Sequence, residues 1–200
     1  MDLSVRIGRA RGIVTSSMRS FVVRTFPPAL ALGVGLGCAE DPPAEDPTPV
    51  PLAAADAWVR VTDPAADAFA SMRPEGTTCD EAGVFLDPFT LSLEINTDLC
   101  DYATVEQPIT RALAPGDVVN IQAFHYELTA PDPAEGYLGL AIDGVIVWEG
   151  SAPIPSAPGP ISGEVALERA FPAGAALQWH VHNHGPNTWE LLSLMVTPSG

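Results

Sequence analysis

The sequence predicts an antiparallel β-sandwich that forms one domain, and three observations carry this prediction. Short segments in which apolar and polar residues alternate recur along residues 58–200, as expected of strands with one buried face. Clusters of proline, glycine, serine and aspartate separate these segments. No sequence stretch of ten or more residues shows the 3.6-residue period of a capped helix. Seven or eight short strands joined by turn-rich loops are typical of a sandwich.

The expected strands follow from these patterns in chain order. The dipeptide Asp143-Gly144 between two β-rich runs predicts a hairpin with a type I′ turn, whose two central residues need positive φ. The run 118–128 changes parity near Ala123, which predicts a bulge there and turns His125 outward. Residues 63–83 and 149–160 are expected to be loops. Strands are expected at residues 58–61, 90–95, 118–128, 137–142, 145–148, 161–167, 177–182 and 189–197, and residues 109–113 are a candidate for a further short strand.

The first 57 residues predict an export signal and a disordered linker rather than a packed domain. Residues 26–38 contain a short apolar run that follows arginines and ends in small residues before Cys38, which is the layout of an export signal. The run is too short to span a bilayer. We therefore expect a signal peptide at residues 1–37, with Met18 as an alternative start. Residues 38–57 are rich in proline and acid and predict a disordered linker before the domain at 58–200.

The end of this segment, Gly35-Leu36-Gly37-Cys38, resembles the lipoprotein box of bacterial lipoproteins, and residues 18–38 are similar to their signals. Glycine stands three positions before the cysteine, where leucine is usual in that family. The resemblance implies that Cys38 is lipidated and becomes the new N-terminus. The protein would then be exported and held by its lipid at the bacterial cell envelope, on the outer membrane or the periplasmic face.

Export also bears on the other two cysteines. Cys79 and Cys100 are the pair that remains once Cys38 is lipidated, and an oxidising compartment favours a disulfide between them. Such a bridge closes a loop of 22 residues and contributes about 3 kcal/mol on the chain-entropy account. A metal site that uses the two thiolates is the alternative, although their spacing is not C-x-x-C.

The charge of the chain is strongly negative after the signal. Four arginines and 24 acidic residues follow Cys38, and the sequence contains no lysine, so a chain that begins there carries a net charge of −20. A surface of this kind repels phosphate backbones and argues against nucleic-acid binding. It is compatible with cations, neutral sugars or basic partners.

Residues 179–190 are the predicted functional stretch, because they hold three of the four histidines and two of the four tryptophans. Strand parity places His180 and His182 on the face opposite to the apolar residues, with His184 at the following turn. Imidazoles gathered on one outward face could hold zinc or copper, and His125 is the candidate further ligand. Two other interpretations stay open: recognition of a ligand by His, Asn and Trp side chains, or hydrogen bonds that merely pin the turn.

The C-terminal half adds a resemblance. This half is similar to the C-terminal part of jelly-roll carbohydrate-binding modules in the order of its elements. They are the Asp143-Gly144 hairpin, the turn Pro172-Ala173-Gly174, a strand, the turn Gly185-Pro186-Asn187 and a last apolar strand. The resemblance covers about 60 residues and implies a jelly-roll-like sandwich that binds carbohydrate. It assigns Asn187 as the sugar contact, with Trp189 or Trp148 as the aromatic platform. Calcium is a further candidate ion, although the family's N-terminal calcium-binding strand has no counterpart here.

Three function classes therefore remain: a ligand-binding module, a metalloprotein and a structural or adhesion lipoprotein. The sequence contains no G-x-S-x-G, P-loop or H-E-x-x-H motif, and it does not predict an enzyme. A histidine-bound metal with Glu127 or Glu190 as base is the one hydrolytic alternative. We favour a membrane-tethered sandwich whose His/Asn/Trp face binds a ligand. On that interpretation, alanine at both His180 and His182 removes binding and leaves the fold nearly intact.

Overall fold

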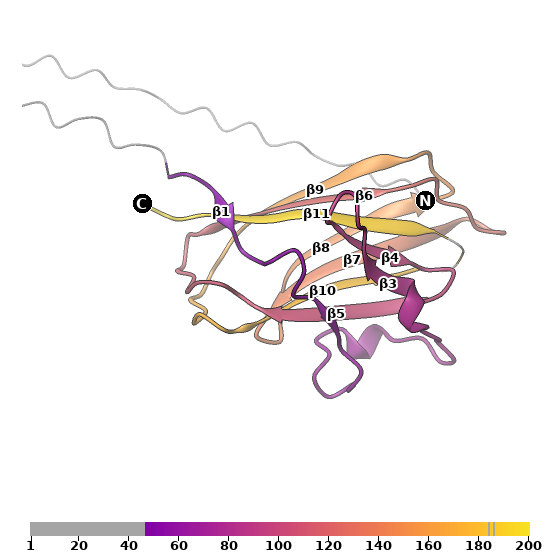
Figure 1. Cartoon of the computed structure of the whole chain (residues 1–200), viewed down its shortest axis with the longest axis horizontal. Coiled ribbons are helices and arrows are strands. Elements are labelled where there is room, and N and C mark those ends of the chain that lie inside the picture. The colour runs from indigo at the N-terminus through magenta and orange to yellow at the C-terminus, as the bar shows by residue number, and fades with distance from the viewer. Residues whose placement is uncertain (1–46, 184, 186) are drawn as a thin grey trace, which may run out of the picture. The chain divides into compact units, whose positions relative to one another are not determined.

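The structure, a computed structural model, describes residues 47–183, 185 and 187–200. In this part of the chain two antiparallel sheets face each other, which confirms the predicted β-sandwich (Figure 1). The signal-like segment, Cys38, the remainder of the linker up to residue 46, and His184 lie outside the described residues. None of the described residues forms a helix long and apolar enough to cross a membrane.

Each sheet is built from strands that are distant in sequence. The six-stranded sheet has the spatial order β3 (Val84–Leu86), β4 (Leu93–Asn96), β11 (Thr188–Thr197), β6 (Val118–His125), β9 (Gly159–Ala166), and β1 (Val50–Pro51) also pairs with β11. The five-stranded sheet has the order β2 (Val59–Arg60), β5 (Tyr102–Pro108), β10 (Ala176–His182), β7 (Ala134–Ile142), β8 (Val145–Ile154). Two 3-10 turns, η1 (Ala70–Met72) and η2 (Glu81–Gly83), lie between β2 and β3.

Alternation along the strands fills the space between the sheets. On β10, Leu177, Trp179 and Val181 face inward and are at most 1% exposed, as the sequence predicts. Burying an aliphatic side chain of this size contributes about 1.5–3 kcal/mol. The β7–β8 hairpin also follows the prediction, because Asp143 and Gly144 have φ values of 50° and 74°. Local sequence therefore specified both the central strand and the tightest turn.

Four predictions about strand positions were wrong. β5 was not expected, because nearly all of its residues are buried and no alternation shows in its sequence. Residues 109–113 form no strand and contribute one bridge, between Leu113 and Phe171. The loop expected at 149–160 shrinks to four residues, since β8 runs to Ile154 and β9 begins at Gly159. Val50–Pro51, which the sequence placed in the linker, pairs with β11.

The bulge expected in β6 lies instead in its neighbour. Leu191 pairs with Ala123 and Ser193 with Gln122, so Leu192 of β11 is the extra residue. β6 keeps one parity throughout, which turns His125 toward the core, where it is 6% exposed. The same parity sends Phe124 to the outer face of the sheet, where the sequence analysis had placed His125.

A loop covers the outer face of the five-stranded sheet. Residues 63–79, here called the cover segment, lie outside β5 and β10 and carry η1 (Figure 1). Gln178 of β10 holds this segment, because its side chain accepts from Ala68 N at 2.9 Å and donates to Ala66 O at 2.7 Å. Phe69 inserts beneath the segment and is fully buried. Both faces of β10 are therefore buried.

Candidate functional site

The two β10 histidines form a hydrogen-bonded chain under the cover segment. His180 Nε2 lies 2.8 Å from His182 Nδ1, and His180 Nδ1 lies 2.8 Å from Thr104 Oγ1. Thr104 in turn donates to Asp67 of the cover segment at 3.0 Å, and Tyr102 donates to the other oxygen of Asp67 at 2.7 Å. The chain therefore joins three segments that are far apart in sequence.

Asp67 fixes the direction of every proton in this chain. A carboxylate only accepts, so the single hydroxyl proton of Thr104 points to Asp67 and its oxygen must accept from His180 Nδ1–H. His180 Nε2 is then the acceptor for His182 Nδ1–H. Both ring nitrogens of His180 are thereby used by protein partners. A metal could bind His180 only by breaking one of these bonds.

His180 is also kept neutral. It is 0% exposed, and the Phe69 ring stacks on it at 4.6 Å with an interplanar angle of 13°. Burial, followed by repulsion from His182, lowers the pKa of His180 to about 2. The outward, solvent-facing position expected for this imidazole was wrong, because the cover segment supplies a second small core on that face. We now expect alanine at His180 to destabilise the fold.

The depressed pKa gives a pH prediction. Unfolded His180 titrates near 6.5, whereas the folded side chain stays neutral, so the unfolded state takes up the proton first as the pH falls. Between pH 5.5 and 4.5, the unfolding free energy of the wild type should fall by about 1.4 kcal/mol more than that of His180→Gln. Guanidinium titrations at the two pH values measure this difference. Equal losses in both proteins would show that His180 does not set the acid sensitivity.

His125 does not complete a metal site with the β10 histidines. His125 lies on the inner side of β6 in the opposite sheet, where its Nδ1–H donates to Tyr126 O at 2.8 Å. It is therefore separated from His180 by the five-stranded sheet, and the predicted convergence of these two rings was wrong. No group of three or more His, Cys, Asp or Glu among the described residues is arranged to hold a metal ion. The predicted ligand His184 lies outside these residues.

The predicted sugar-binding residues are structural in their immediate contacts. Trp189 is 1% exposed and its Nε1 donates to Asn183 Oδ1 at 2.9 Å. Asn187 is 2% exposed and accepts from Thr129 N at 2.6 Å, while its Nδ2 has no partner among the described residues. Trp148 is half-buried and stacks on Trp179 with ring centroids 6.0 Å apart. None of the three predicted residues presents an open surface to a sugar.

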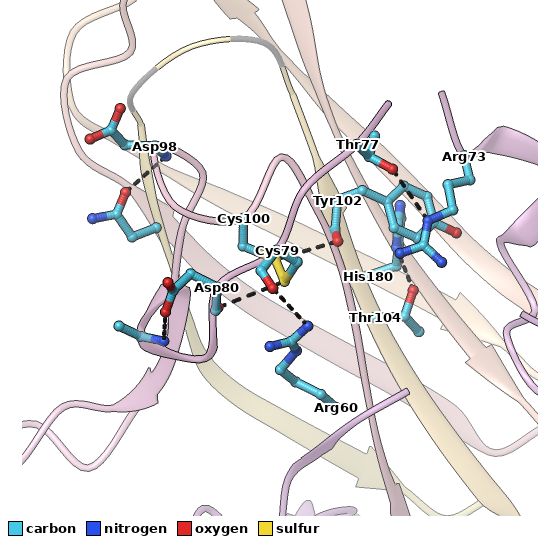
Figure 2. The surroundings of a disulfide bond; sticks show 12 residues. Arg60, Arg73, Thr77, Cys79, Asp80, Asp98, Cys100, Tyr102, Thr104 and His180 are labelled. Atoms are coloured by element: carbon cyan, nitrogen blue, oxygen red, sulfur yellow. Dashed lines mark hydrogen bonds between the residues drawn. A yellow bond between two sulfur atoms is a disulfide. The ribbon is translucent and has the colours of Figure 1, made fainter. Parts of the chain in front are cut away.

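The predicted disulfide is present. Cys79, at the end of the cover segment, is bonded to Cys100, which lies two residues before the start of β5 (Figure 2). Arg60 donates to the carbonyl oxygen of Cys79 at 3.2 Å, and the guanidinium of Arg73 lies 5.0 Å from the centre of the Tyr102 ring. These contacts join the C-terminal half of the cover segment to the five-stranded sheet. The thiols are therefore engaged with each other rather than with a metal.

A partly exposed face that the sequence did not predict lies on the other sheet, although Glu190 at its centre is only 7% exposed. Strand register aligns Phe85, Glu94, Glu190 and Phe124 side by side across β3, β4, β11 and β6. We call these four residues the aromatic–acidic row. Tyr126 is 46% exposed just beyond it, with its ring 5.5 Å from that of Phe124 and perpendicular to it. Phe85 is 39% exposed, so rings border the carboxylates on both sides.

The carboxylates of this face influence one another. Burial raises the pKa of Glu94, and the charges of Asp87 and Glu190 raise it further. Asp87 stays acidic, because the backbone N–H groups of Thr90 and Phe89 donate to it and lower its pKa. Ser92 donates to the Glu190 carboxylate and fixes its position. The negative charge is strong enough to raise the pKa of Tyr126, with Glu190 as the largest cause.

Sequence reasoning missed this face for a definite reason. The apolar residues Phe124, Tyr126 and Leu128 share one parity, and the assumption that this parity marks the core required the bulge at Ala123. Along β6 the structure places the opposite set, including Ala123 and His125, toward the core, and of the three expected residues only Leu128, beyond the end of the strand, is buried. An aromatic residue on a solvent face cannot be distinguished from a buried one by hydropathy. The polar residues Gln122 and Glu127 have opposite parity, so they indicate different solvent faces for the two ends of the run, and this conflict was the one sign that its core face was uncertain.

Comparisons with known proteins give similar folds and no family. No protein-family profile and no curated protein sequence matches the chain. Several solved structures are similar to it. The carbohydrate-binding module TmCBM27, described as having specific mannan recognition, has a TM-score of 0.44 and 10% identity, and the match covers 76% of this chain and 96% of that one. The xylan-binding domain CBM22-1 of Paenibacillus barcinonensis Xyn10C has a TM-score of 0.38, 12% identity and coverages of 71% and 85%, and the arabinose-bound α-L-arabinofuranosidase MgGH51 has 0.43, 13%, and coverages of 74% and 24%.

The chain spans about a quarter of that arabinofuranosidase and most of the two binding modules. At these identities and TM-scores the similarities do not identify a ligand. The ligand of this chain has to be inferred from its own surface.

Proposed function

We propose that this domain is a carbohydrate-binding module whose ligand lies on the aromatic–acidic row of the six-stranded sheet. The observation that carries the proposal is the register that places two carboxylates directly between two phenylalanines, with Tyr126 beside them. This site replaces the His/Asn/Trp face, where His180, Asn187 and Trp189 are buried and Trp148 and His182 are partly exposed.

The chemistry of the row suits a sugar. A pyranose has apolar C–H faces that pack on aromatic rings and a rim of hydroxyls that donate to carboxylates. Neighbouring strands lie about 4.8 Å apart, so the four residues of the row extend over about 14 Å. This length is enough for an oligosaccharide rather than a single ring. Because these side chains are held on hydrogen-bonded strands, the protein loses little conformational entropy when a ligand binds.

The test is titration of the domain with neutral oligosaccharides of xylose, mannose, glucose and galactose, followed by calorimetry. We expect Tyr126→Ala and Phe124→Ala each to weaken binding at least tenfold, or about 1.4 kcal/mol, because each removes a stacking ring. Tyr126→Phe should retain most of the affinity. Val59→Ala is the matched control, since Val59 is 64% exposed on the other sheet. Full affinity in both alanine variants would exclude this face.

We also propose that the domain is lipid-anchored at the cell envelope through Cys38. The support is the signal-like run before this cysteine and the acidic, proline-rich sequence after it. A disulfide in the domain agrees with an oxidising compartment. Residues 39–49, between Cys38 and β1, would form a tether of 11 residues that holds the domain away from the membrane surface.

Replacing Cys38 by serine tests the anchor. The wild type should partition into detergent and take up a clickable palmitate analogue, because the acylated cysteine holds it in the bilayer. Cys38→Ser should lose the label and move to the aqueous phase. A wild-type chain that stays unlabelled and aqueous would contradict the anchor and leave the sugar-binding proposal untouched.

A further inference from the structure

The geometry points to a positively charged sugar as the ligand of the aromatic–acidic row: we infer that the row recognises an oligosaccharide of amino sugars with free ammonium groups. This inference rests on the proposed carbohydrate-binding function and narrows its ligand class. It is carried by the charges on the face and by the positions of the cations of the domain.

Three carboxylates on this face have no compensating cation among the described residues. Glu94 and Glu190 are directly opposed on neighbouring antiparallel strands, an arrangement that is destabilising for like charges. Asp87, at the start of the β3–β4 turn, adds a third charge that acts on Glu94. Among the groups that alter the titration of Glu94 there is no cation. The repulsion therefore persists in the unliganded domain.

The arginines of the described chain are engaged elsewhere. Arg60 and Arg73 belong to the five-stranded sheet and its cover segment, where they contact the Cys79 carbonyl and the Tyr102 ring. Arg111 acts on Asp117, and Arg169 lines a cavity at the start of β8 and the end of β9. The sequence contains no lysine, so among the described residues no further basic side chain is left to neutralise this face, and a cationic ligand would supply that charge.

An ammonium group on a sugar ring matches this arrangement. Placed between Glu94 and Glu190, it would make charge-assisted hydrogen bonds to both carboxylates and remove their mutual repulsion. The flanking rings of Phe85 and Phe124 attract cations through their faces as well as the C–H face of the sugar. A neutral sugar can donate hydrogen bonds to Glu94 and Glu190 but does not reduce the repulsion between these carboxylates. A uronic acid adds a further negative charge and increases this repulsion.

The test compares ligands that differ in charge alone. Glucosamine hexamers, their N-acetylated counterparts and galacturonic acid hexamers are titrated into the domain at 50 and 300 mM salt. We expect the amine to bind at least tenfold more tightly than the acetylated chain at low salt, and this advantage to shrink at high salt. The galacturonic acid chain should not bind. Spermidine, which carries ammonium groups without sugar rings, should bind at least tenfold more weakly than the glucosamine hexamer.

Two variants link the preference to the row. Glu94→Gln keeps the shape of the side chain and removes its charge, so it should reduce the ratio of the amine affinity to the acetylated-hexamer affinity at least fivefold. Glu164→Gln is the control, because Glu164 is an exposed carboxylate on β9 of the same sheet and lies outside the row. Thermal unfolding of both variants confirms that they remain folded.

The outcomes separate this inference from the proposed function. Equal binding of the amine and acetylated hexamers, or an amine preference that survives in Glu94→Gln, overturns the ammonium specificity and leaves a carbohydrate-binding module. Spermidine that binds as well as the glucosamine hexamer overturns the requirement for sugar rings. Failure of every hexamer and every neutral oligosaccharide overturns both proposals.

Discussion

Replacing Phe69 by alanine is expected to lower the free energy of unfolding by about 3–5 kcal/mol, the range for a buried phenylalanine truncated to alanine. Phe69 is 0% exposed, stacks on His180 and lies over Gly139. A Cβ at Gly139 would fall 2.3 Å from the Phe69 ring, so the ring can pack on the sheet here only because residue 139 has no side chain. Truncation would leave a cavity above His180 and loosen the cover segment.

Guanidinium unfolding monitored by tryptophan fluorescence measures this effect. Phe69→Leu is the matched comparison, because it keeps much of the volume and should recover at least half of the loss. Hydrogen exchange should show faster exchange at Ala68 N, which Gln178 protects in the wild type. A loss below 1 kcal/mol in Phe69→Ala would mean that the cover segment contributes little to the fold.

Removal of the disulfide should have the next largest effect. Replacing Cys79 and Cys100 by serine is expected to cost about 3 kcal/mol, because the unfolded chain gains the freedom of a loop whose ends are 21 positions apart. The cover segment would still be held by Phe69 and Asp67, so a folded but less stable protein is expected.

Denaturation of the wild type with and without reductant gives the control for this prediction. Reduced wild type should unfold at the same guanidinium concentration as the double serine variant, and reductant should have no effect on that variant. Intact mass before and after reduction reports whether the bridge forms. Equal stability of the oxidised protein and the double variant would contradict the entropic contribution of the bridge.

The two predictions concern the same structural feature. Phe69 and the disulfide both hold residues 63–79 on the outer face of β5 and β10. This attachment is what buries His180 and converts an apparent metal-binding face into a hydrogen-bonded support. A sandwich with one covered outer face and one open outer face has its open surface on the six-stranded sheet, where the aromatic–acidic row lies.

Sequence was sufficient where a property is local. The Asp143-Gly144 turn needs positive φ at both residues, and the alternation of Leu177, Trp179 and Val181 needs one buried face, so neither depends on distant contacts. The Cys79–Cys100 pairing followed from the resemblance to exported lipoproteins and from the small number of cysteines. The antiparallel sandwich follows from many short strands with turn-rich connections.

The tertiary structure decided which surfaces are open. Alternation shows that a strand has two faces, but it cannot show that a loop more than a hundred residues earlier in the chain will cover one of them, as Phe69 covers His180. Nor can it show that Glu94 and Glu190 are opposed, because that depends on the register between two strands far apart in sequence. Burial and register are properties of pairs of segments, and a single strand does not encode them. The sequence therefore determined the sandwich and its central strand, whereas tertiary packing moved the candidate site from the histidines to the aromatic–acidic row.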